Sequence, residues 1–144
     1  MGTKFSEIFD LFLSSIDDYE LFQVEDEELD DILCTYLYGC FGHIQNGVRN
    51  LADINKEEKC FNVELSIVEQ SLVAKAMKLE WVSGRKYSQE LMEKSIGDRD
   101  YKAVQGTDYL KGLSQVETQL RREIERMSID YSFSEEDFFG GLIV

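Results

Sequence analysis

The chain lacks proline, has one histidine and one tryptophan, and carries only 15 basic residues against 29 acidic ones among its 144 residues. Proline breaks helices and is common in the turns of β-sandwiches and barrels, so its absence favours a helical protein. No apolar run approaches the ~20 residues of a membrane-spanning helix, and the N-terminus does not have the layout of a secretion signal. We therefore expect one helical unit of ordinary domain size that does not enter a membrane.

The net charge of −14 limits the class of partner. A surface of this charge is repelled by nucleic acid and by anionic lipid, and it favours a basic partner or keeps a crowded assembly in solution. The acids between Asp17 and Asp31 have no basic residue among them. They are typical of a solvated loop followed by an acid-rich first helical turn, which the helix dipole favours, or of an acidic face with a function.

Motifs that carry enzymatic chemistry are missing as well. The sequence has no Gly-x-Ser-x-Gly, no Gly-x4-Gly-Lys-Ser/Thr phosphate loop and no Gly-x-Gly-x-x-Gly. A Cys/His nucleophilic pair needs a positioned base and an oxyanion site, and a di-iron centre needs inward-facing acids and more than one histidine. We predict that the protein is not an enzyme and that it has no catalytic or cofactor-binding residues.

The three cysteines and the single histidine do not form a recognisable metal site. Cys40 and His43 are three residues apart, a spacing that suits a shared metal on a helix, with Cys34 and Cys60 as further ligands. Six residues of helix, however, turn the Cys34 and Cys40 side chains about 120° apart, and no Cys-x2-Cys or His-x3-His pair is present. We predict no metal and three buried, reduced thiols in a cytosolic chain.

Apolar residues at three- and four-residue steps predict an all-α protein with four to five helices. The third has the clearest start, because Ser66 and Glu69 match a capping box, and we expect it to end at Ser83-Gly84. The segment 48–62 is less regular, with Leu51, Ile54 and Phe61 as apolar anchors. The helices are expected at about 6–16, 26–44, 66–83, 88–96 and 100–131.

The last of these helices is long and carries a repeat typical of helix–helix packing. Its apolar residues recur at alternating steps of three and four, with Glu117 interrupting the series, and Gly106 and Gly112 are positions for a bend. We divide the chain into a helical domain, 1–132, and an extended apolar C-terminal interaction tail, 133–144. The predicted partner-binding residues are Phe133, Phe138, Phe139, Leu142, Ile143 and Val144 in the tail and Leu113, Leu120 and Ile124 in the helix.

Several short segments carry a family resemblance. They are Phe5-Ser-Glu-Ile-Phe-Asp-Leu-Phe-Leu-Ser-Ser-Ile-Asp-Asp-Tyr19, Leu33 with Tyr36-Leu37, Phe61-Asn with Glu64-Leu65, Met77-Lys-Leu-Glu-Trp-Val-Ser83, Asp98 to Tyr101, Tyr109-Leu110-Lys, and Asp130-Tyr-Ser132. In this order they resemble the head–tail connector (adaptor or neck) proteins of tailed phages of Gram-positive hosts. Gly84-Arg85 stands where that family is expected to have a proline, and residues 133–144 have no counterpart in it.

The resemblance implies a structural virion protein that forms a ring of about twelve copies, in which each subunit presents two different faces to its neighbours. Such a ring lies beneath the portal, and DNA passes through its lumen without specific binding. The implied partners are other copies of the chain, the portal protein and a neighbouring neck or tail-completion protein. The implied location is the head–tail interface of the virion, after assembly in the host cytoplasm.

Two other function classes remain open from the sequence. An acidic inhibitor that imitates DNA would bind a basic host protein with a strong dependence on salt. A metal-dependent helical enzyme would hold stoichiometric metal.

Overall fold

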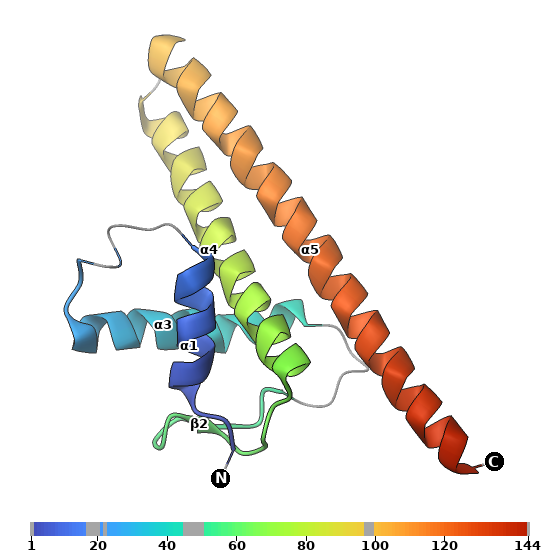
Figure 1. The fold of residues 1–144 in the computed structure, drawn as a ribbon. Helices are drawn as coiled ribbons and strands as arrows, with labels where there is room; N and C mark the ends of the chain where they lie inside the picture. The colour runs from blue at the N-terminus through green and yellow to red at the C-terminus, as the bar shows by residue number, and fades with distance from the viewer. Residues whose placement is uncertain (1, 17–20, 22, 45–50, 97–99, 144) are drawn as a thin grey trace.

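The computed structural model describes residues 2–16, 21, 23–44, 51–96 and 100–143, and it describes side chains in these ranges except those of 92–96, 100–107 and 130–143. Within these residues the protein is almost entirely helical (Figure 1). The α-helices are α1 (Phe5–Ser15), α3 (Asp26–Cys40), α4 (Ile67–Ile96) and α5 (Asp100–Ile143), and a 3-10 turn η1 (Phe41–His43) follows α3. The predicted all-α class with one long C-terminal helix is confirmed.

Helices α4 and α5 form a long antiparallel pair, and α1 and α3 both pack against α4 (Figure 1). The helix predicted at about 6–16 is confirmed, and Phe5, Ile8, Phe9 and Phe12 on one of its faces are all buried. Each such side chain contributes roughly 1.5–3 kcal/mol when it leaves water. In the described part of the chain no helix combines the length and the apolar character needed to cross a bilayer.

A small hairpin, which the sequence did not predict, closes the lower end of the fold. Strand β1 (Ile54–Asn55) pairs with β2 (Cys60–Phe61), and the N-terminal residues lie alongside β2. The Thr3 carbonyl accepts a 2.7 Å hydrogen bond from the Phe61 amide. A side chain on Gly2 would meet the Phe61 carbonyl oxygen at 2.2 Å, so this close approach requires glycine. Of the expected anchors, Leu51 and Phe61 are buried and Ile54 is half-buried.

The start of α4 is as predicted, but its end is not. The Ser66 amide donates to Glu69 Oε1 at 3.0 Å and the Glu69 amide donates to Ser66 Oγ at 3.2 Å, which is the expected capping box. The helix then continues through Gly84 to Ile96 as one helix of 30 residues, so the predicted stop at Ser83-Gly84 and the separate helix 88–96 were wrong. A glycine costs only about 1 kcal/mol in a helix, and contacts with α5 on both sides of it offset that cost.

Helix α5 likewise has no break within its 44 residues. It passes through Gly106 and Gly112 without interruption and continues past Ser132 to Ile143, so no helix end marks the boundary expected at 132/133. A tail separated from the helix was expected; in the structure, residues 133–143 are its last turns. The side chains of Phe133, Phe138, Phe139, Leu142 and Ile143, and the whole of Val144, lie outside the described residues.

Candidate interaction surface

Polar contacts fix how α4 and α5 lie against each other. Lys75 Nζ on α4 lies 2.9 Å from Glu123 Oε2 on α5, and eight residues further along α4 the Ser83 hydroxyl donates to Glu117 Oε2 at 3.1 Å. Because the partners move backward along α5 as the contacts move forward along α4, these pairs define an antiparallel register. The Arg85 guanidinium and the Tyr109 hydroxyl, 3.4 Å apart, continue it toward the other end of the pair.

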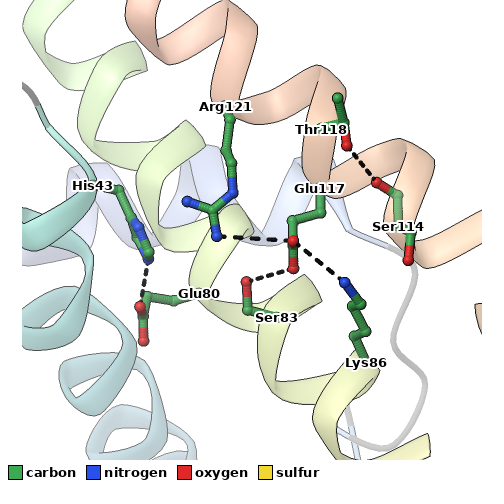
Figure 2. Close-up of polar contacts among 8 residues, drawn as sticks. All are labelled: His43, Glu80, Ser83, Lys86, Ser114, Glu117, Thr118 and Arg121. Atoms are coloured by element: carbon green, nitrogen blue, oxygen red, sulfur yellow. Dashed lines mark hydrogen bonds and ion pairs between the residues drawn. The ribbon is translucent and has the colours of Figure 1, made fainter. Parts of the chain in front are cut away.

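Glu117, which interrupts the apolar repeat of the long helix, is the centre of this arrangement (Figure 2). Its side chain is 16% exposed and accepts the hydrogen bond from Ser83, while Lys86 and Arg121 lie 3.6 and 3.8 Å from its carboxylate. The carboxylate therefore has a hydrogen-bond donor and two cations around it, as a largely buried charge requires. The interruption in the repeat marks a polar contact between the helices.

Three of the predicted partner-binding residues contact the subunit itself. Leu120 and Ile124 are 5% and 1% exposed, and Leu113 is half-buried against the same core. Their apolar surface is used where α5 packs on α4, as the 3.5-residue repeat requires. Leu120 and Ile124 therefore belong to the chain's own core in this conformation, and their role in partner binding stays a prediction.

The register shows where α5 loses its partner helix. Ile67, the first residue of α4, lies eight residues before Lys75. Because Lys75 pairs with Glu123 and the helices are antiparallel, the start of α4 lies opposite position 131 of α5, eight residues after Glu123. Residues 133–143, called the α5 overhang below, continue beyond that point, away from α1 and α3 (Figure 1). At 1.5 Å per residue the overhang is about 16 Å long. Most of the predicted tail residues belong to it.

A groove of about 680 Å³ lies beside the middle of α4, where α3, α4 and the first third of α5 meet. The half-buried Trp81 and Tyr36 form much of its apolar wall, together with Tyr109. The Arg85 guanidinium lies 4.9 Å from the centre of the Trp81 ring, a stacking contact that holds the cation at the groove. Its lining residues are Leu21, Val24, Ile32, Tyr36, Trp81, Gly84, Arg85, Ser88, Gln89 and Tyr109.

Sequence reasoning missed this groove, because its wall comes from segments far apart in the chain. One local signal was present: Trp81 and Arg85 are four residues apart, the spacing at which side chains of one helix meet. The expected helix end at Gly84 concealed that signal.

The acidic stretch and Arg121 have ordinary structural roles where they are described. Asp26, Glu27 and Glu28 form the first turn of α3, as the helix dipole favours, and Asp30 pairs with Lys59 on the hairpin. That hydrogen bond raises the pKa of the Lys59 ammonium group. Arg121 pairs with Glu117 within α5. Asp17, Asp18 and Glu20 lie outside the described residues.

The single histidine forms a structural contact between η1 and α4, and the three cysteines lie in α3 and β2. His43 Nε2 lies 2.5 Å from Glu80 Oε1 (Figure 2). Glu80 has room beside α3 because residue 39 is glycine; a Cβ atom there would lie 2.7 Å from the other carboxylate oxygen of Glu80. Burial, and secondarily the charge of Glu80, raise the pKa of the Cys40 thiol above its usual range. The three cysteines are buried and free, and the described residues include no group of three metal-binding side chains.

No protein-family model matches the chain, and no curated protein or solved structure is similar to it at a significant level. The resemblance to head–tail connector proteins therefore stays a prediction drawn from short sequence segments.

Proposed function

We propose that the protein is a structural adaptor that assembles as a ring at the junction between a phage head and tail, beneath the portal. The order of the resembling segments and the helical fold support this role. The observation that carries the proposal is the α5 overhang, which extends about 16 Å beyond the helix that α5 packs on. The sequence of this segment includes Phe133, Phe138, Phe139, Leu142 and Ile143, apolar residues suited to contact with another subunit.

A ring subunit needs two different faces, because a head-to-tail contact joins one face of each copy to another face of the next. The overhang and the groove at Trp81 are separate surfaces, one beyond the start of α4 and the other beside its middle, which is consistent with such an arrangement. The net charge of −14 suits a ring around a DNA channel, because acidic walls repel phosphates and let DNA pass without binding. The ring is expected to have about twelve copies and to contact the portal and a neighbouring neck or tail-completion protein.

The test is assembly with the portal protein encoded in the same phage genome. Full-length protein mixed with portal is expected to give stacked rings in electron micrographs and a co-migrating complex in size-exclusion chromatography with light scattering. A variant that lacks residues 133–144 is expected to keep its helical circular dichroism and its melting temperature but to remain a monomer that does not join portal rings. Substitution Ile67→Ser is the matched control, because it removes an apolar side chain that is 83% exposed outside the overhang.

Equal incorporation of the truncated and full-length proteins would contradict the proposal. A complex with a basic host protein that dissociates steeply with salt, without rings, would instead favour the DNA-mimic alternative.

A further inference from the structure

The geometry points to a specific contact between copies: the groove lined by Trp81 and Tyr109 binds the α5 overhang of a second copy of this chain. This inference deepens the proposed ring assembly, because it names the segment and the surface that join neighbouring subunits.

The overhang cannot reach the groove of its own subunit. Tyr109 lines the groove and lies 29 residues before Phe138 on the same continuous helix, a separation of about 44 Å along the axis. Helix α5 is continuous between them, so it does not fold back. The overhang that occupies this groove therefore comes from another copy, and the resulting contact is head-to-tail, the kind that closes rings.

The charges of the two surfaces are complementary. Among the described residues that line the groove, Arg85 is the one charged side chain and none is acidic, although 29 of the 144 residues in the chain are acidic. The overhang carries Glu135, Glu136 and Asp137 immediately before Phe138 and Phe139. An acidic segment followed by two aromatic residues matches a groove that combines a guanidinium group with aromatic walls.

The shape of the groove also suits aromatic side chains. Its volume of about 680 Å³ lies within the range of roughly 300–1,000 Å³ that is typical of binding pockets. At Gly84 a side chain would meet nothing within 4 Å, so the groove has open space beside α4. A second groove, between α1, α4 and α5, is smaller at about 450 Å³ and contains Glu123, whose carboxylate already pairs with Lys75.

The test uses the full-length chain and a synthetic peptide of residues 131–144. Trp81 is the only tryptophan and lines the groove, so its fluorescence reports occupation directly. At protein concentrations where light scattering shows monomer, titration with the peptide is expected to give saturable binding and a change in Trp81 emission. A peptide with the same residues in scrambled order serves as the probe control.

Two glycines provide a matched pair of variants. Gly84→Phe fills the groove, whereas Gly112→Phe adds the same side chain at a helical position that is equally open but does not line it. Both replacements favour the helix, and circular dichroism verifies the fold. We expect the peptide to bind Gly84→Phe about tenfold more weakly or worse, the loss typical of an aromatic anchor excluded from its pocket, and to bind Gly112→Phe as tightly as wild type.

If Gly84→Phe does not fold, Tyr109→Ala replaces it, because that side chain is 45% exposed and its truncation leaves the core intact. No saturable binding to the wild-type chain, or equal binding to Gly84→Phe and wild type, would overturn the inference. Neither result would count against the adaptor role, because portal association is read separately by electron microscopy.

Discussion

Helices α1 and α5 both pack against α4, but different kinds of contact hold them there. Within its 11 residues α1 buries Phe5, Ile8, Phe9 and Phe12. Along α5, over the described side chains of 108–129, the buried apolar residues are Leu120 and Ile124. There the packing is supplemented by directional contacts of two carboxylates, Glu117 and Glu123, with α4.

The difference assigns different tasks to the two interfaces. Burial of apolar surface supplies most of the free energy of folding but does not specify direction, so α1 anchors the domain. The ion pair between Lys75 and Glu123 is partly exposed and contributes little stability, but the directional contacts of Glu117 and Glu123 fix the position of α5. A slip of α5 by one turn, about 5.4 Å, would separate Glu117 from Ser83 and Lys86. The polar contacts therefore set how far the α5 overhang extends beyond α4.

The largest effect that tests this comparison is expected at α1. Phe12 is fully buried, with its ring centre 5.9 Å from that of Tyr36. Substitution Phe12→Ala removes this packing and leaves a cavity, so the free energy of unfolding should fall by about 3–5 kcal/mol in urea titrations followed by circular dichroism.

Tyr87→Ala is the matched control for this substitution, because it removes an aromatic side chain from a helix position that is 63% exposed. Its effect should stay within about 0.5 kcal/mol. Similar losses for the two variants would mean that α1 does not anchor the domain.

An intermediate effect is expected at the polar contact between α4 and α5. Glu117→Ala removes the acceptor of the Ser83 hydroxyl and the partner of Lys86 and Arg121, so it should cost about 1–2 kcal/mol of unfolding free energy. Glu117→Gln keeps an oxygen that can accept the Ser83 hydrogen bond and should cost less. A double-mutant cycle with Ser83→Ala measures the coupling, and additive losses would show that the contact does not join the helices.

The parts of the fold that were predictable from sequence are those set by local pattern. Three- and four-residue spacing identified α1 and the packing face of α5, and the pairing of Ser66 with Glu69 identified the start of α4. The extent of α4 was not predictable from sequence. The low helix propensity of Gly84 is visible in the sequence, but the contacts with α5 that stabilise the helix beyond Gly84 are tertiary contacts. The β1/β2 hairpin was missed because strands of two residues have no alternating pattern.

For the candidate interaction surface, too, features set by local sequence were predictable and features set by tertiary contacts were not. The overhang was identified from its composition, which is local, although its continuity with the long helix was not expected. Leu120 and Ile124 were assigned to a partner because a packing repeat in the sequence does not say whether the second helix belongs to the same chain. The groove at Trp81 required Tyr36, Arg85 and Tyr109 to be brought together from three helices, and no sequence pattern encodes that.

The smallest effect is expected at Glu123 and should depend on pH. The hydrogen bond from Lys75, the largest cause, lowers the pKa of the Glu123 carboxyl below its ordinary value of 4.5. Because the folded state holds this proton less tightly than the unfolded state, the stabilisation is fully present above pH 4.5 and is lost as the pH falls through the folded pKa. Both side chains are 38% exposed, so Glu123→Gln should cost at most about 1 kcal/mol near neutral pH.

Urea titrations across this pH range should show that the free energy of unfolding falls less steeply with decreasing pH for Glu123→Gln than for wild type. Lys75→Met should reproduce that shallower decline. If the wild-type and Glu123→Gln proteins lose stability in parallel as the pH falls, the contact between Lys75 and Glu123 contributes nothing to holding α5 on α4.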